Sequence, residues 1–249
     1  MIIYLAASKT MDDSCGEIVP EKLTEPLFAG NASVIAHALN EYSASELQQI
    51  LKINGALAML NKKRYMDFDV PSASIPAAWA YTGTAYKSLD VRSWNAADVD
   101  FAQKHLLIGS FLYGLLRPLD AIHPYRLEGN VTLPALDHKS IFDYWKPILT
   151  EQLIDAVKAD DGTLVNLASS EYTRLFDWKR VCKELTVVSP VFKVDFGGKE
   201  KVVALYAKMC RGAMTRWLVL NQSKSPRDIT RFQYQGFANT VGYEFSMMI

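Results

Sequence analysis

Short apolar runs along the chain predict buried β-strands. The run at residues 1–7 and the run at residues 163–168 are too short for helices, and polar residues follow each of them directly. Residues that alternate between apolar and polar flank Gly197-Gly198, a pair that suits a hairpin turn. We expect strands at residues 1–7, 163–168, 191–196 and 201–206, and an edge strand at 241–245.

Apolar residues at helical spacing predict the helices that separate these strands. We expect helices at residues 31–42, from Ser43 or Ser45 to about 53, at 56–64, at 98–116, at 141–159 with Ser140 as the cap, and at 207–220. Residues 12–30 and 71–97 are rich in residues that interrupt regular structure and are expected to be irregular. The expected fold is therefore α/β of mixed type, a central mixed sheet flanked by helices, in a single domain that spans residues 1–249.

Residues 43–66 are expected to form a helix, a short turn and a second helix. Asn54-Gly55 suits a left-handed turn that ends the first helix. This element resembles a helix-hairpin-helix, whose backbone amides contact a nucleic-acid phosphate without reading bases. The candidate residues are Ile53, Asn54 and Gly55 of the turn and the basic run Lys62, Lys63 and Arg64. The motif usually carries two glycines, and only one is present, so an ordinary helical hairpin with a solvated basic run is the alternative.

Charge is balanced over the whole chain and uneven along it. The 27 Lys and Arg residues match 27 Asp and Glu residues, which argues against a generally basic nucleic-acid protein. Residues 174–231, however, carry 13 Lys and Arg against 5 Asp and Glu. This asymmetry indicates one face for a polyanion, and the alternative is a set of lysine-rich surface helices.

The sequence lacks the usual signals for membranes, metals and cofactors. No apolar run approaches the roughly 18 residues of a membrane span, and the N-terminus has no basic leader, so we expect a cytoplasmic protein without a membrane partner. Cys15, Cys182 and Cys210 are too scattered for a disulfide framework or a zinc site. Phosphate-loop, dinucleotide-binding, HExxH and CxxC motifs do not occur. We therefore expect no cofactor and no metal.

Charged residues follow several of the expected strands. Lys9 comes just after the first strand, Glu171 follows the strand at residues 163–168, and Lys208 and Arg211 share one stripe of the helix after the last hairpin. Segments of this kind can converge at one edge of an open sheet and form a binding crevice. Arg117, Asp120, Arg126 and Glu128 lie in a rigid loop that the expected helix at 98–116 delivers, and they form either a structural clamp or part of a site.

Five segments taken together are similar to the YaaA-like peroxide stress proteins. They are Ser8-Lys9-Thr10, residues 112–120, residues 124–128, residues 166–172, and Tyr206-Ala207-Lys208 with Arg211-Gly212, in that order. The resemblance implies a cytoplasmic, single-domain α/β fold with a helix-hairpin-helix and a basic cleft that binds DNA. It also implies a role in limiting intracellular iron and DNA damage under hydrogen peroxide. Two departures are Ala7, where the family has proline, and Asn130, where it has glycine.

The resemblance also assigns site residues. The cleft would be lined by Lys9, Arg117, Arg126, Lys208 and Arg211, with Glu128 and Glu171 beside them. The leading hypothesis is a DNA-binding protein without sequence specificity that acts in peroxide defence. The alternative is an enzyme for a nucleobase or nucleotide, with Glu171 or Glu128 as the proton carrier. In either case Asp120 and Glu128 can neutralise Arg117 and Arg126, leaving Lys9, Lys208 and Arg211 to meet the ligand. Iron sequestration finds no cluster of ligands to support it.

Overall fold

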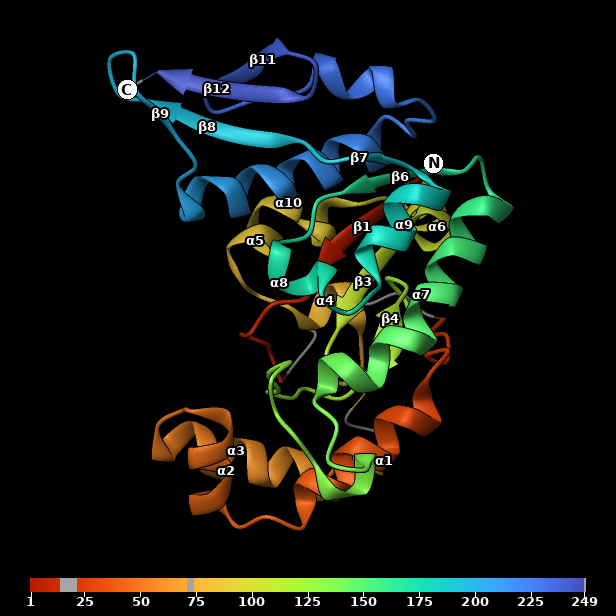
Figure 1. The fold of residues 1–249 in the computed structure, drawn as a ribbon, viewed down its shortest axis with the longest axis vertical. Helices are drawn as coiled ribbons and strands as arrows, with labels where there is room; N and C mark the ends of the chain where they lie inside the picture. The colour runs from red at the N-terminus through yellow and green to blue at the C-terminus, as the bar shows by residue number, and fades with distance from the viewer. Residues whose placement is uncertain (14–21, 71–73, 249) are drawn as a thin grey trace.

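A mixed five-stranded sheet lies at the centre of the protein (Figure 1). The computed structural model describes residues 1–13, 22–70 and 74–248. The sheet has the order β4-β3-β1-β6-β7. Its strands are β1 (Ile2–Ala6), β3 (Leu106–Ser110), β4 (Gly114–Leu116), β6 (Thr163–Asn166) and β7 (Thr186–Val188). All pairs are parallel except β3 with β4, so the expected central mixed sheet is confirmed, as are the two strands expected near residues 1–7 and 163–168.

A second five-stranded sheet, which the sequence did not reveal, lies at the upper end of the view in Figure 1. Its order is β10-β11-β12-β8-β9. Its strands are β8 (Val191–Asp195), β9 (Glu200–Lys201), β10 (Gln233–Tyr234), β11 (Phe237–Val241) and β12 (Glu244–Met248). The expected edge strand at 241–245 is wrong, because Gly242 with φ +55° turns the chain there and β12 pairs on both sides. A small pair, β2 (Ile75–Pro76) and β5 (Ala121–Ile122), completes the strands of the described residues.

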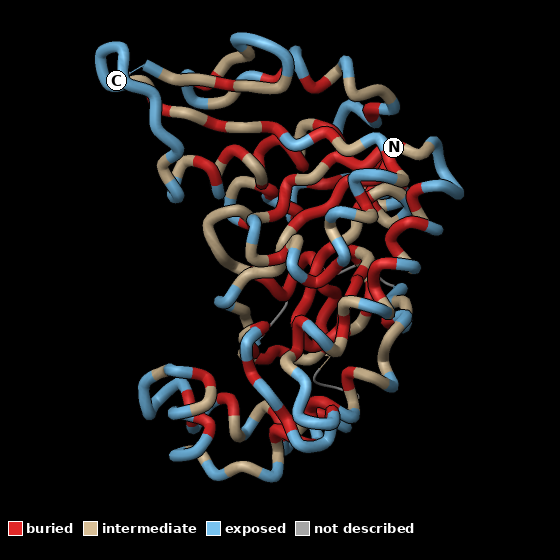
Figure 2. Tube along the Cα trace, in the orientation of Figure 1, coloured by how far each residue is buried: buried red, intermediate tan, exposed pale blue. Residues whose placement is uncertain are grey.

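Helices cover the central sheet and connect the two sheets. The helices are α1 (Ala29–Asn40), α2 (Ala44–Leu51), α3 (Gly55–Met66), α4 (Ala77–Ala80), α5 (Thr84–Leu89), α6 (Ala96–His105), α7 (Ile141–Ala159), α8 (Ser170–Thr173), α9 (Trp178–Glu184) and α10 (Ala204–Leu220). Helix α10 packs on β1 and on β8, so it joins the two sheets, and α7 packs on β4 and β6. The apolar side chains of both sheets form one buried cluster (Figure 2). The single domain remains a prediction, which this shared core supports.

The long helix expected at residues 98–116 is wrong. Helix α6 ends at His105, and the apolar residues after it form the antiparallel strands β3 and β4. The Ser110 hydroxyl accepts the Tyr113 N–H at 2.9 Å, and Gly114 takes a φ of +71°, which turns the chain between these strands. A continuous apolar run fits a buried strand as well as a helix, and here the pairing of β3 with β1 favours the strand while the turn at Gly114 returns the chain as β4.

Three further expectations need correction. Residues 75–97 contain α4, α5 and a 3₁₀ helix, Val91–Ser93, rather than only irregular chain, and residues 71–73 lie outside the described part. The strand expected at 201–206 is short, because α10 already begins at Ala204. The irregular segment expected at 12–30 gives way to α1 at Ala29, and residues 14–21 lie outside the described part.

Helices α2 and α3 form a hairpin at the opposite end of the protein from the second sheet (Figure 1). Ser43 caps α2 by accepting the Glu46 N–H, and the Glu46 carboxylate accepts the Ser43 N–H in return. The left-handed residue that ends α2 is Lys52, with φ +53°, and not the expected Asn54-Gly55 pair. Asn54 instead caps α3 by accepting the Leu57 N–H at 2.9 Å.

Candidate functional site

The ends of β1 and β6 meet at a switch point of the central sheet. These strands are parallel neighbours, and the chain leaves β1 toward β3 on one side and leaves β6 toward β7 on the other. Connections that diverge in this way leave a crevice at the carboxyl ends of the strands. The residues that follow the two strands, 7–10 and 167–172, therefore face each other across a ready-made opening.

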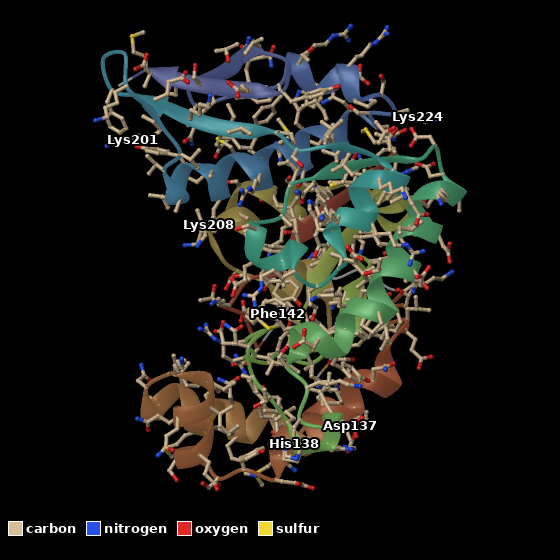
Figure 3. The ribbon with its side chains drawn as sticks, in the orientation of Figure 1. Asp137, His138, Phe142, Lys201, Lys208 and Lys224 are labelled. Atoms are coloured by element: carbon tan, nitrogen blue, oxygen red, sulfur yellow. The ribbon has the colours of Figure 1, made fainter. Side chains whose placement is uncertain are left out.

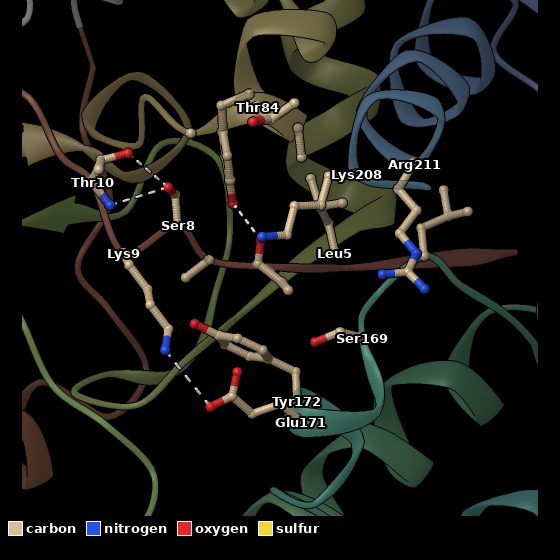
Figure 4. Close-up of a pocket in the computed structure, with 16 residues that line it drawn as sticks. Leu5, Ser8, Lys9, Thr10, Thr84, Ser169, Glu171, Tyr172, Lys208 and Arg211 are labelled. Atoms are coloured by element: carbon tan, nitrogen blue, oxygen red, sulfur yellow. Dashed lines mark hydrogen bonds and ion pairs between the residues drawn. The ribbon is translucent and has the colours of Figure 1, made fainter. Parts of the chain in front are cut away.

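A pocket of about 310 Å³ occupies this crevice, and we call it the strand-end pocket. Its walls come from the residues after β1, the start of α5, the residues after β6, and α10 (Figure 4). Its polar side chains are Ser8, Lys9, Thr10, Thr84, Tyr86, Ser169, Glu171, Tyr172, Lys208 and Arg211. The structure thus brings Lys9, Glu171, Lys208 and Arg211 together, as the positions of these residues after strands and on one helical stripe suggested.

Two glycines allow the walls of the pocket to approach one another. A Cβ atom on Gly212 would lie 1.8 Å from the Ala85 carbonyl oxygen, so only glycine lets α10 pack this closely on α5. A Cβ atom on Gly83 would lie 2.1 Å from the Ser8 hydroxyl oxygen. The close packing of α10 places Lys208 and Arg211 at the pocket.

Lys208 and Arg211 are the cations of the pocket that carry no carboxylate partner. Within the described residues neither side chain forms an ion pair, whereas Lys9 forms two. Arg211 is half-buried, and this burial lowers the pKa of its guanidinium from the ordinary value while leaving it protonated at neutral pH. An anion that enters the pocket would therefore interact with two cations whose charge no carboxylate of the described residues balances.

The carboxylates of the site are held by the remaining cations. Lys9 Nζ lies 2.7 Å from one oxygen of Glu128 and 4.0 Å from Glu171. Arg126 donates to the other oxygen of Glu128 at 2.7 Å and to the Lys9 carbonyl at 3.2 Å. Glu128 thus bridges Lys9 and Arg126, and it fixes the spacing of the two cations.

A second groove of about 350 Å³ adjoins the strand-end pocket, and we call it the hairpin groove. It is lined by Lys9, Ile50, Leu51, Lys52, Arg126, Glu128, Asn130 and Val131. Because Lys9 lines both, the pocket and the groove form one cleft between the central sheet and the α2–α3 hairpin. Lys52 is a cation of this cleft that sequence reasoning missed, since its place at the left-handed end of α2 depends on turn geometry.

The structure does not bring Arg117 to the cleft, since Arg117 lines neither the strand-end pocket nor the hairpin groove. Its guanidinium donates to Asp120 at 2.8 and 3.1 Å and to the Glu25 carbonyl at 3.0 Å. Asp120 is buried and also accepts the Thr24 hydroxyl at 2.6 Å. The loop at Arg117 is therefore a structural clamp, whereas its later part, with Arg126 and Glu128, belongs to the cleft.

The basic run of α3 is partly engaged in structural contacts. Lys62 donates to the backbone carbonyl of Asn40, and Arg64 pairs with Asp13 at 2.8 Å. Gly55 and its successor Ala56 lie exposed at the N-terminus of α3. Of the proposed hairpin residues, the turn is therefore better placed than the basic run to meet a ligand.

Two buried tyrosines of the pocket were also missed by sequence reasoning. The Tyr86 hydroxyl donates to the Ala6 carbonyl at 3.1 Å, and the Tyr172 carbonyl accepts the Tyr4 hydroxyl at 3.2 Å. Burial raises the pKa of both pocket tyrosines well above the ordinary value, so both stay neutral. They therefore present aromatic surface and no charge.

Thiols and metal ligands add little to the site. Cys210 is buried, which raises the pKa of its thiol to about 12, Cys182 is exposed, and Cys15 lies outside the described residues. Over residues 1–13, 22–70 and 74–248, no three His, Cys, Asp or Glu side chains come together as metal ligands. In the same ranges no helix has the length and apolar character needed to cross a bilayer.

Comparisons with known proteins place the chain in a family. The sequence profile of the peroxide stress protein YaaA family matches residues 1–240. A UPF0246 protein of Phocaeicola vulgatus is 44% identical over 245 residues, which cover 98% of this chain and 95% of the relative. UPF0246 proteins of Bacteroides fragilis and Porphyromonas gingivalis are 43% and 41% identical over 95% of this chain, and the matches cover 92% and 93% of those relatives. The chain belongs to the peroxide stress protein YaaA family.

Proposed function

We propose that the protein binds duplex or distorted DNA without sequence preference, through backbone phosphates, as part of the peroxide stress response. In this role it acts in the cytoplasm and limits iron-dependent oxidative damage to DNA. The observation that carries the proposal is the cleft, in which Lys208 and Arg211 have no carboxylate partner among the described residues and Lys52 lines the adjoining groove. Phosphate oxygens are the anions that such unpaired cations bind, whatever the base sequence.

The α2–α3 hairpin supports the same proposal from the other side of the cleft. Helix α3 has 12 residues, and the amides of Gly55 and Ala56 lie at its exposed N-terminus. The N-terminus of a helix favours an anion through its free N–H groups and its dipole. A DNA strand that extends from the strand-end pocket along the hairpin groove would pass Lys52, and its next phosphates would reach these amides.

A salt titration of DNA affinity tests the proposal. We expect the logarithm of the association constant for a mixed-sequence duplex to fall linearly with the logarithm of salt concentration. Because each neutralised phosphate contributes a slope of about −0.9, the Lys208→Ala/Arg211→Ala variant should bind more weakly at low salt, with a slope reduced by about 1.8. A similar loss should be found for duplexes of unrelated sequence.

A second pair of cations provides the matched control. The Lys224→Ala/Arg227→Ala variant removes the same charge from exposed residues that line neither part of the cleft, and Lys224 lies on the opposite side of the view from Lys208 in Figure 3. Its affinity and slope should stay close to those of the parent protein. A flat salt dependence, no binding at low salt, or an equal effect of the two double variants would refute the proposal.

Catalysis on a nucleobase or nucleotide is the second candidate function, and the exposure of one carboxylate favours it. The Glu171 side chain is 39% exposed inside the strand-end pocket, whereas Glu128 is held between two cations. Glu171 is therefore the better placed of the two to move a proton. The test is a panel of damaged DNA and nucleotides offered to the parent protein and to Glu171→Gln. A reaction that the parent protein catalyses and Glu171→Gln does not, with DNA affinity retained, would establish this function. If the parent protein turns over no member of the panel, this candidate function is refuted.

A further inference from the structure

Lys9 and Glu171 present a hydrogen-bond donor and an acceptor side by side in the strand-end pocket. The Lys9 ammonium lies 4.0 Å from a Glu171 carboxylate oxygen, and Figure 4 shows the two groups close together, on one side of Tyr172. An ammonium only donates hydrogen bonds, and an ionised carboxylate only accepts them through two oxygens. A ligand that fits this end needs an acceptor next to two N–H donors.

The rest of the pocket has the two features that a nucleotide needs. Tyr86 and Tyr172 give it aromatic wall surface, and Arg211 lies across Tyr172 from Lys9 in Figure 4. Together with Lys208, Arg211 offers the unpaired positive charge that a phosphate requires. The volume of about 310 Å³ is at the small end of ligand pockets, so its interior accommodates one nucleotide, whereas a paired duplex would stay at the mouth and meet the cations there through its phosphates.

We propose that the strand-end pocket receives a single nucleotide extruded from DNA in the cleft, and that guanine is the preferred base. The proposal rests on the DNA binding proposed above. The Lys9 ammonium donates to guanine O6, and the Glu171 carboxylate accepts from N1–H and from the exocyclic N2 amino group. The base lies against Tyr172, and a flanking phosphate meets Lys208 and Arg211.

The other bases match this pair of groups less well. Adenine and cytosine each place one amino donor beside a ring nitrogen that accepts, and thymine places one N–H between two carbonyls. Against any of these bases the Glu171 carboxylate gains one hydrogen bond rather than two, and its second oxygen faces an acceptor or remains unpaired. Leaving a desolvated polar group unpaired costs more than the bond itself returns, so the preference should be large enough to measure.

The layout of the cleft favours a nucleotide that is still part of a strand. Lys9 lines both the strand-end pocket and the hairpin groove, so a strand held in the groove passes the mouth of the pocket. A base that is already unpaired costs least to extrude. The expected ligand is therefore an unpaired guanine within a duplex.

Duplexes that differ in one unpaired nucleotide test this proposal. Fluorescence anisotropy at fixed low salt would compare a fully paired duplex with duplexes that carry a single bulged G, A, C or T. We expect the bulged guanine duplex to bind about tenfold more tightly than the other three bulges, as one well-made bidentate base contact provides. In Glu171→Gln this preference should vanish, because the amide offers one acceptor in place of two, while affinity for the paired duplex is retained or rises.

The control variant is Asp155→Asn, which removes an exposed negative charge from α7 outside the cleft and should keep the guanine preference. Equal binding of the four bulges, or a guanine preference that survives in Glu171→Gln, would overturn the proposal while leaving DNA binding intact. Absence of binding to every duplex would instead refute the proposed function. Free dGMP is the last arm: if it binds more tightly than dAMP through Glu171 while bulged guanine gains nothing, the pocket serves free nucleotides and the DNA-linked proposal is wrong.

Discussion

Replacing Arg117 with alanine should weaken the fold and leave DNA binding intact, the reverse of replacing Arg211. The Arg117 guanidinium donates two hydrogen bonds to Asp120 and one to the Glu25 carbonyl. The Asp120 side chain is 1% exposed, so losing its charged partner leaves a buried carboxylate that keeps two donors among the described residues, the Thr24 hydroxyl and the backbone N–H of residue 117. This residue therefore acts on stability and not on the ligand.

The magnitude follows from the burial of the two partners. Removing one member of a fully buried ion pair costs about 3–5 kcal/mol. The Arg117 side chain is 41% exposed and Asp120 keeps two donors, so we expect a smaller loss, about 2 kcal/mol in the free energy of unfolding. For a chain of this length such a loss lowers Tm by about 4–8 °C.

Urea denaturation followed by circular dichroism would measure the loss, and anisotropy would measure DNA affinity at 25 °C for Arg117→Ala and Arg211→Ala in parallel. Arg117→Lys should recover part of the stability, since it restores the charge and not the forked donor geometry. Our reasoning is refuted if Arg117→Ala keeps its stability within about 0.5 kcal/mol, the usual range of neutral surface changes, and weakens DNA binding as much as Arg211→Ala does.

Three other predictions concern a close helix contact, a helix cap and a half-buried histidine. Gly212→Ala should cost about 1–3 kcal/mol of stability by thermal unfolding and weaken DNA binding, because its Cβ meets the Ala85 carbonyl; Gly30→Ala, with open space around it in α1, should be neutral or stabilising by up to about 1 kcal/mol. Ser43→Ala should lower the free energy of unfolding by about 1 kcal/mol through the lost cap of α2, as urea titration would show. Burial lowers the pKa of His123. As pH falls, the unfolded chain therefore takes up the proton before the folded chain does, and the free energy of unfolding should fall from about pH 7 to about pH 5. Urea titrations at several pH values should show a smaller fall in His123→Asn.

Local signals in the sequence account for the parts of the fold that were predicted correctly. The strand near residues 1–7, the cap at Ser140 and the turn at Gly197-Gly198 depend on neighbours in the chain, and all three are present. The run at 98–116 fits a buried helix or a buried strand equally well, and tertiary pairing of β3 with β1 decides it. The second sheet depends on the parallel pairing of β12 with β8, a contact between distant segments that periodicity does not encode.

The candidate site divides in the same way. The convergence of Lys9 and Glu171 follows from the rule that loops after parallel strands share an edge, so sequence order was sufficient to suggest it. Arg211 reaches the pocket differently, from α10, which packs on α5 and β1. Tyr86, Tyr172 and Lys52 were missed because their roles depend on the folded chain. The tyrosines act through their burial in the pocket wall, and Lys52 through the left-handed backbone conformation that ends α2. Arg117 was placed in the cleft by resemblance, although the neutralisation by Asp120 that the sequence also suggested is what the structure contains.

The carboxylates of the cleft bear on how firmly the protein can hold a polyanion. A phosphate that approaches Lys9 or Arg126 must compete with Glu128, which lies 2.7 Å from each of them. Such a phosphate gains less than one that meets Lys208 or Arg211, because the charge of the cation is already balanced. The salt slope of binding should therefore reflect the unpaired cations and not the full set. Lys9 and Glu171 should contribute little to that slope, and their proposed part is the hydrogen-bond recognition of a base.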